Sequence, residues 1–171
     1  MVFFENAGGS QVAQMVIDAV GESLKYRHRS MIGSKTKEKA RECIRKIVGT
    51  KGDEPVILGP NATTLLAALA DRYVRHGLLC SGDEIILSTE NHSANFDPWL
   101  QAAKDTGATV KFWCPHSTKV DGTQLSHRLE DLVTGNTRLV AMPHASNVLG
   151  QIRDLQSLAS IVKSQSQGYA H

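Results

Sequence analysis

The feature that most constrains this chain is a regular alternation, from residue 55 onward, of short apolar runs with longer amphipathic segments. Apolar runs of four or five residues between turn-forming residues are typical of strands that are buried on both faces. The segments between them carry apolar residues at helical spacing. Strands that alternate with helices build a parallel sheet with helices on both faces. The sequence therefore predicts an α/β fold with a mostly parallel sheet.

Four runs are predicted to be strands, and four segments are predicted to be helices. The strands are residues 55–58, 84–87, 109–113 and 138–142. The helices are residues 61–77, 99–106, 125–132 and 155–163. In the first of these helices Gly77 is the stop signal, and four side chains are expected to face inward: Leu65, Leu66, Leu69 and Tyr73.

The first 50 residues show helical spacing of a different kind. Two apolar faces recur at i, i+3, i+4, i+7 and i+8: Val12, Met15, Val16, Ala19 and Val20, then Ala40, Cys43, Ile44, Ile47 and Val48. The basic and polar stretch from Lys25 to Thr36 is predicted to be a loop between two helices. Cys43 is predicted to be a core residue and not a reactive thiol. We therefore expect a helical segment over residues 1–50 and a sheet-bearing domain over residues 51–171.

Composition places the chain among globular proteins and argues against several classes of partner. Of its 171 residues, 41% are hydrophobic and 21% are charged, which is too apolar for a disordered chain. The formal net charge is only +2, so a basic nucleic-acid-binding surface is not expected. No apolar run approaches the roughly 20 residues that span a bilayer. We expect no nucleic-acid partner, no membrane partner and no secretory signal.

Cysteine usage argues for a reducing location. Cys43, Cys80 and Cys114 are odd in number and lack CxxC spacing, so neither a disulfide framework nor a zinc site is predicted. His116 and His127 follow Cys114 at irregular spacing, so no metal site is expected there. A cytoplasmic chain is the default expectation. No GxSxG motif is present, so serine-hydrolase chemistry has no support.

Three segments are predicted to lie at the carboxyl ends of strands, where open α/β sheets bind ligands: 59–64, 88–99 and 143–150. The first opens a helix with Asn61, Ala62, Thr63 and Thr64. Backbone N–H groups at a helix start, together with the helix dipole, form an anion site, although an ordinary helix N-cap explains the same residues. The chain has neither GxGxxG nor GxxxxGK[ST], so dinucleotides and nucleoside triphosphates are not favoured as ligands.

His92 and Asn147 are the side chains of the other two segments that best suit a ligand. His92 lies among small and polar residues, and an exposed imidazole there can stack on a planar ligand or transfer a proton. Asn147 follows a predicted strand and offers an amide that both donates and accepts hydrogen bonds. A loop histidine with a local hydrogen bond and an ordinary turn asparagine explain the same two residues without a ligand.

In this order and spacing, four motifs resemble the class V aminotransferase family, the fold-type I pyridoxal-phosphate enzymes that include cysteine desulfurases. Phe4–Ser10 is similar to the family's "LDNAA" stretch, and Gly59–Leu66 is similar to its "GATE" or "GTTE" phosphate loop. Glu90–Trp99 is similar to "EHHSNxxPW", and His144–Gly150 is similar to "HVSNVLG". The resemblance covers nearly the whole chain. It is closest to the desulfurase-like branch that carries "NAGGSQ" and "GPNATT".

The resemblance implies a site for pyridoxal 5′-phosphate. By position, Ala62 and Thr63 would bind the cofactor phosphate, and His92 would stack on the pyridine ring. Asn147 would hydrogen-bond the phenolic oxygen of the cofactor. The substrate carboxylate would be bordered by Asn6 and Gly8.

The resemblance also implies groups that do not align with any residue here. Family members carry an Asp that pairs with the pyridinium nitrogen, then a Gln or His, and then the Schiff-base lysine, all beyond the "HVSNVLG" segment. None of the ten lysines of this chain aligns with that lysine, so no catalytic residue is assigned. Without the Asp and the lysine the cofactor loses its electron sink and its covalent anchor. We therefore expect the N-terminal half of a large domain, truncated before the Schiff-base lysine.

Two classes of function follow from the resemblance. The first is a pyridoxal-phosphate-dependent enzyme that acts on a small amino acid, similar to cysteine desulfurases but incomplete and inactive as the isolated chain. The same parts serve C–C and C–S lyases and epimerases. The second is a non-catalytic fragment that pairs with a full-length homologue, because family members are typically homodimers. A Rossmann-like nucleotide binder fits less well, because the glycine motif is missing.

Overall fold

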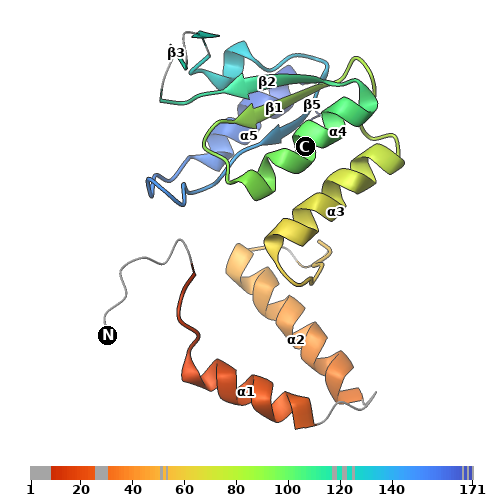
Figure 1. Cartoon of the computed structure of the whole chain (residues 1–171), viewed down its shortest axis with the longest axis vertical. Coiled ribbons are helices and arrows are strands. Elements are labelled where there is room, and N and C mark those ends of the chain that lie inside the picture. Colours follow the sequence, from red (N-terminus) through yellow and green to blue (C-terminus); the bar gives the residue numbers. More distant parts are fainter. Residues whose placement is uncertain are drawn as a thin grey trace. The chain divides into compact units, whose positions relative to one another are not determined.

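The computed structural model describes residues 9–25, 31–50, 52, 54–116, 119–120, 123–124, 126–166, 168 and 170. The chain separates into two compact units, Met1–Gly59 and Pro60–His171. Figure 1 shows the helices and strands of both units in chain order. None of the helices within the described ranges is long and apolar enough to cross a lipid bilayer.

The described residues of the first unit form two helices, α1 (Gln14–Lys25) and α2 (Met31–Val48). Both predicted helices are confirmed. The predicted loop over residues 25–36 is wrong for residues 31–36, because α2 already begins at Met31. Residues 31–36 contain one lysine together with Gly33 and Ser34, so intrinsic helix propensity does not explain why the helix begins this early.

The packed side of α2 mixes apolar and charged residues, and the predicted burial of Cys43 is wrong because this thiol is exposed. Arg41 and Arg45 are half-buried, and both side chains bond to the segment that follows the helix. Arg41 Nε donates to the carbonyl oxygen of Val56 (3.1 Å), and Arg45 Nε donates to that of Glu54 (3.4 Å). Ala40 and Ile44 of the predicted apolar face are half-buried as well, whereas the residues at its C-terminal end are exposed, so apolar spacing identified only part of the packed side of α2.

The predicted strand over residues 55–58 is also wrong, because this segment is irregular. The carbonyl of Val56 accepts its hydrogen bond from the Arg41 side chain, and Ile57 is 74% exposed. An apolar run forms a strand only where a second strand completes its ladder of hydrogen bonds. Here arginine side chains occupy backbone acceptors that a neighbouring strand would otherwise use.

The second unit is built on a parallel sheet of three strands in the order β2-β1-β5. These strands are β1 (Glu84–Ser88), β2 (Thr109–Trp113) and β5 (Thr137–Ala141), and each was predicted from its apolar run. Ile86 of β1 pairs with Lys111 on one side and Val140 on the other. A small antiparallel ribbon joins β3 (Lys119–Val120) to β4 (Thr123–Gln124). The predicted parallel α/β architecture is therefore confirmed.

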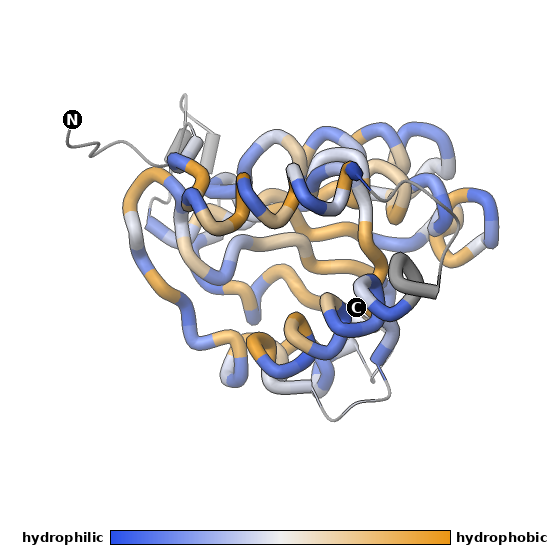
Figure 2. The backbone as a smooth tube through the Cα atoms, turned by 90° about the horizontal axis from the view of Figure 1, so that it is seen from below, coloured by the Kyte–Doolittle hydropathy of each residue, from blue (hydrophilic) through white to orange (hydrophobic). Residues whose placement is uncertain are grey.

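Helices cover both faces of this sheet, as Figure 1 shows for α4 and α5. The α-helices are α3 (Ala62–Arg75), α4 (Asp97–Thr106) and α5 (Leu155–Gln165), and the 3₁₀ turns are η1 (Ser93–Asn95) and η2 (Leu129–Asp131). Because side chains alternate along a strand, Ile85 and Leu87 pack with Trp99 of α4, whereas Ile86 packs with Val162 of α5. Figure 2 shows the resulting apolar strands between helices of mixed polarity.

Two details of the predicted helices of this unit are wrong. Leu69 is 46% exposed, and the residue of α3 that is buried in the core is the smaller Ala70, at 3%. Of the predicted helix over residues 125–132, the described residues contain only η2. Ser126 forms a bridge with Trp113 and its carbonyl accepts from the N–H of Cys114 (3.1 Å), so extended backbone displaces the first turn of that helix. Leu125 lies outside the described residues.

Candidate functional site

The carboxyl ends of β1 and β5 bring the second and third candidate segments together, because these two strands are neighbours in the sheet. The side-chain amide of Asn91, which follows β1, donates to the carbonyl oxygen of Ala141 at the end of β5 (2.7 Å). The α3 helix, which opens with the first segment, packs against η1 directly after His92. The loop that carries His92 is therefore in contact with the end of β5 and with α3.

The start of α3 presents exposed backbone donors. Asn61 is extended and caps the helix by accepting the N–H of Thr64 on its side-chain oxygen (2.8 Å). The side chains of Ala62 and Thr63 are exposed, and the described residues supply no acceptor for their N–H groups. The N-cap thus satisfies one N–H of the first turn and leaves two donors at the positive end of the helix dipole.

His92 is exposed, and its ring is held by a local hydrogen bond. It is the N-cap of η1, and its Nδ1 accepts the backbone N–H of Ala94 (3.1 Å). Because Nδ1 is the acceptor, the neutral ring carries its proton on Nε2. The backbone before it is anchored to the sheet, since the N–H of Thr89 donates to the carbonyl of Trp113 (2.9 Å). The imidazole is therefore presented in one orientation at the end of the central strand.

Two asparagines that flank His92 build the support of this loop. Asn95 donates to the side-chain oxygen of Asn91 (3.2 Å), and the indole Nε1 of Trp99 donates to that of Asn95 (3.2 Å). Trp99 is a core residue, only 2% exposed. A chain of three hydrogen bonds therefore runs from the core, through both amides, to the end of β5. The sequence signal that was missed is the spacing of four between Asn91, Asn95 and Trp99.

Asn147 lies exposed at the tip of a tight turn after β5. The turn closes on Ser146, which is 8% exposed and whose hydroxyl accepts the N–H groups of Val148 (3.3 Å) and Leu149 (3.0 Å). Gly150 follows with a left-handed φ of 68°, and its N–H donates to the carbonyl of Ser146 (2.9 Å). The side chain of Asn147 is thus displayed on a rigid turn. Within the described residues its amide forms no hydrogen bond with His92.

A charged cluster next to these loops was not found from the sequence. Arg153 pairs with Glu90 from the loop that carries His92, and Glu90 Oε1 lies 2.6 Å from His116 Nε2. The guanidinium carbon of Arg153 lies 5.2 Å from the centre of the Trp113 ring. The paired side chains of Glu90 and Arg153 are only 11% and 14% exposed. The residues come from the loops after β1, β2 and β5, which are far apart in the sequence.

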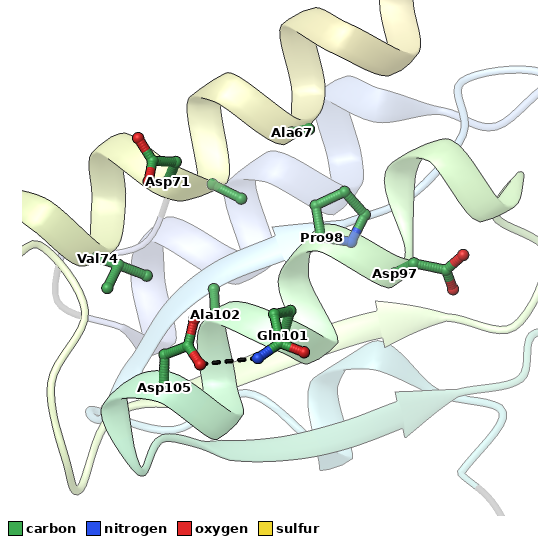
Figure 3. A pocket seen from close by; sticks show the side chains of 9 residues that line it. Ala67, Asp71, Val74, Asp97, Pro98, Gln101, Ala102 and Asp105 are labelled. Atoms are coloured by element: carbon green, nitrogen blue, oxygen red, sulfur yellow. Dashed lines mark hydrogen bonds between the residues drawn. The ribbon is translucent and has the colours of Figure 1, made fainter.

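A separate pocket of about 470 Å³ lies between α3 and α4. Figure 3 shows the side chains that line it. Its lining residues are Ala67, Ala70, Asp71, Val74, Asp97, Pro98, Gln101, Ala102 and Asp105. Gln101 donates to Asp105 (2.7 Å), and three carboxylates border the pocket, so it does not suit a phosphate. None of the predicted ligand residues lines it.

The remaining predictions concern other parts of the chain. Asn6 and Gly8 lie outside the described residues. No group of three or more His, Cys, Asp or Glu residues suited to a metal ion occurs in the part of the chain that the structure describes. Glu84, at the amino end of β1, is structural: burial favours a raised pKa, but hydrogen bonds from Lys111 and Thr134 outweigh it and hold the pKa of Glu84 below its ordinary value.

Comparisons with known proteins point to one family. The sequence model described as Aminotransferase class-V matches residues 2–169. The chain is 33% identical to the aminotransferase-like protein FGM3 of Gibberella zeae over 94% of its length and 42% of that protein. It is also 33% identical to a probable cysteine desulfurase of Halalkalibacterium halodurans, again over 94% of its length but 41% of the relative.

A comparison of structures gives the same result. The cysteine desulfurase CsdA of Escherichia coli superposes with a TM-score of 0.74 at 27% identity, over 92% of this chain and 41% of that one. The chain thus spans less than half the length of the relatives that it matches.

Proposed function

Because the chain belongs to the class V aminotransferase family, we propose that its second unit forms part of a pyridoxal 5′-phosphate site that acts on an amino acid. The observation that carries this proposal is the contact of α3 with η1, directly after His92, beyond the end of a strand that neighbours β5. We propose that the exposed N–H groups at the start of α3, the ring of His92 and the turn that displays Asn147 face one ligand there. Members of this family use that cofactor.

The start of α3 suits the phosphate of the cofactor. A phosphate dianion needs several donors and benefits from a positive dipole end. The N–H groups of Ala62 and Thr63 provide two such donors, and the Thr63 hydroxyl adds a third. These are neutral donors on a rigid helix, so binding does not require a flexible charged side chain to become ordered.

His92 and Asn147 suit the ring of the cofactor. With Nδ1 already bonded to Ala94, the imidazole is held in place with an exposed face on which a pyridine ring can stack. The amide of Asn147 can donate to a phenolic oxygen from its exposed turn. When bound, the cofactor supplies an electron sink for carbanions formed on the amino acid. The residues of this chain orient it and shield one face of its ring.

Turnover is proposed for a larger assembly and not for these 171 residues. None of the ten lysines matches the position of the lysine that anchors the cofactor in the family. For the whole protein we propose desulfuration of cysteine as the leading reaction, supported by the probable cysteine desulfurase that is 33% identical. The equally similar Gibberella zeae relative is named only an aminotransferase-like protein, so a C–C or C–S lyase is the alternative. Release of alanine from cysteine distinguishes the two.

Pairing with a second chain, either a copy of this one or a longer homologue, is part of the proposal. It is supported by apolar side chains of α1 that are exposed in the described unit, such as Met15 at 77% and Leu24 at 63%. Sedimentation at several protein concentrations, with and without a full-length relative, tests it. We expect the chain in the cytoplasm, because Cys43 and Cys80 are exposed free thiols, which persist in reducing compartments.

The test is a titration of the full chain with pyridoxine 5′-phosphate, which lacks the aldehyde and cannot react with surface lysines. Binding at one site per chain is expected, and pyridoxine without phosphate should bind at least tenfold more weakly. The His92→Ala substitution should weaken binding about tenfold, the equivalent of one lost contact of about 1.4 kcal/mol. His76→Ala is the matched control, because His76 is exposed and contributes only its backbone N–H to the end of α3. Equal effects of the two substitutions would refute the proposed site.

The covalent step is tested separately with pyridoxal 5′-phosphate, borohydride reduction and peptide mapping. We expect scattered or absent labelling of lysines. One lysine labelled stoichiometrically would contradict the proposal that these residues lack the anchoring lysine.

A further inference from the structure

Two charged residues that are not proposed to touch the cofactor connect the loop of His92 to the segment after Asn147. Glu90 lies two residues before His92, and Arg153 lies six residues after Asn147. Their side chains form an ion pair between the loop after β1 and the segment that leads into α5. A pair at 11% and 14% exposure loses most of its hydration, so it persists only if its geometry is well fixed.

Arg153 is fixed by groups on three sides. Its guanidinium lies over the ring of Trp113, with 5.2 Å between the guanidinium carbon and the ring centre. That ring is itself immobile, because Trp113 is 3% exposed and its Nε1 donates to the carbonyl of His127 (3.1 Å). The backbone N–H of Arg153 donates to the carbonyl of His144 (2.9 Å), which begins the turn that carries Asn147.

Glu90 is fixed in a similar way. One carboxylate oxygen pairs with Arg153, and the other lies 2.6 Å from Nε2 of His116. Its backbone N–H lies 3.3 Å from the hydroxyl of Ser88, which is fully buried at the end of β1. The next residue, Asn91, ties the same loop to the backbone of β5. The ion pair is therefore the side-chain link that connects this loop to the segment beyond the Asn147 turn.

We infer that Glu90 and Arg153 are positioning residues, which set the spacing between the His92 loop and the Asn147 turn. The inference rests on the proposed cofactor site, since that site needs both loops to reach one ring. Asn91 and Asn95 fix the His92 loop to the end of β5 and to the core. The ion pair fixes the same loop to the segment that follows the Asn147 turn. Small displacements of groups that must contact one planar ligand lower affinity strongly, even when each group is intact.

The experiment compares four full-length chains in titrations with pyridoxine 5′-phosphate: unsubstituted, Arg153→Gln, His92→Ala and the double variant. Arg153→Gln should weaken binding at least fivefold. In the His92→Ala background the same change should weaken binding less than twofold, because a positioning residue acts through the group that it positions. Arg153→Lys should recover part of the affinity by keeping the charge. Arg128→Gln is the control, because Arg128 forms an exposed pair with Glu130 at 3.9 Å.

Hydrogen exchange of the ligand-free chains separates this inference from the proposed function. Arg153→Gln should speed exchange of peptides covering residues 88–99 and 143–153, whereas Arg128→Gln should not. If the unsubstituted chain does not bind the probe, the proposed function fails and the exchange result alone decides whether the pair positions the loops. If Arg153→Gln leaves exchange unchanged, or weakens binding equally in both backgrounds, the inference is overturned.

Discussion

Removal of the Asn91 side chain tests the support of the His92 loop most directly. Asn91 donates to the carbonyl of Ala141 (2.7 Å) and accepts from Asn95 (3.2 Å), so Asn91→Ala deletes two hydrogen bonds. Each bond contributes about 1 kcal/mol net, and leaving a buried acceptor unpaired costs about 1–3 kcal/mol. Ala141 is 6% exposed, so its carbonyl has little access to water as a replacement donor. We expect the free energy of unfolding to fall by about 2–3 kcal/mol.

The assay is urea unfolding of the full chain followed by circular dichroism, with thermal melts as a second measure. For a domain of this size, 2 kcal/mol lowers the melting temperature by about 4–8 °C. Asn136→Ala is the matched control, because Asn136 is exposed and the described contacts of this residue are made by its backbone. That variant should remain within about 0.5 kcal/mol of the unsubstituted chain.

A double-mutant cycle decides whether the hydrogen-bond chain acts as a unit. Asn91→Ala and Asn95→Ala share one bond, so the double variant should lose about 1 kcal/mol less than the sum of the single losses. Strictly additive losses, or a loss for Asn91→Ala that matches Asn136→Ala, would refute the reasoning.

Three further predictions concern the fold around the site. The pKa of Glu84 is held below its ordinary value of 4.5, so the stability that Glu84 contributes is present above about pH 4.5 and is lost as the pH falls through the lower pKa of the folded state. Urea midpoints measured between pH 3 and 6 should therefore depend less on pH in Glu84→Gln than in the unsubstituted chain. Ile86→Ala should lower the free energy of unfolding by about 2–5 kcal/mol, because Ile86 is fully buried, whereas Ile57→Ala at a 74% exposed position should change it by less than about 0.5 kcal/mol in the same urea assay. Gly150→Ala should lower the free energy of unfolding by about 1–2 kcal/mol in thermal melts, because Gly150 has a positive φ. Gly135→Ala is the control, since Gly135 lies in open space without a positive φ; an equal loss there would show that φ is not the cause.

The parallel sheet was predictable from the sequence because its central strand is buried on both faces. Ile85, Ile86 and Leu87 form a run without a polar residue, and such a run has few alternatives to a strand covered by helices. The run at residues 55–58 carries the same local signal, yet it forms no strand. Its outcome depends on Arg41, which lies 15 residues earlier and takes the backbone acceptor of Val56. The local pattern of residues 55–58 contains no information about this distant arginine.

The candidate site was predictable only in part for a related reason. The side chains of Asn61 and His92 accept backbone N–H groups three and two residues further along the chain, so their capping roles can be predicted from the local sequence. The bond from Asn91 to Ala141 spans 50 residues, and the pair of Arg153 with Glu90 spans 63. Such contacts depend on which strands are neighbours in the sheet, and the order β2-β1-β5 is not encoded in any single segment.

The order of the strands also explains why the polar groups of this site gather where they do. In a parallel sheet the loops that follow the strands all lie at the carboxyl edge, and the central strand has a neighbour on each side. The loop after β1 can therefore contact the loop after β2 through His116 and the segment after β5 through Arg153 at the same time. Glu90 lies in that central loop, where it pairs with Arg153 and lies 2.6 Å from Nε2 of His116, and His92 follows two residues later. A ligand held against His92 would thus contact a loop that is supported on both sides, which is the physical reason to look for the cofactor at this edge and not in the acidic pocket between α3 and α4.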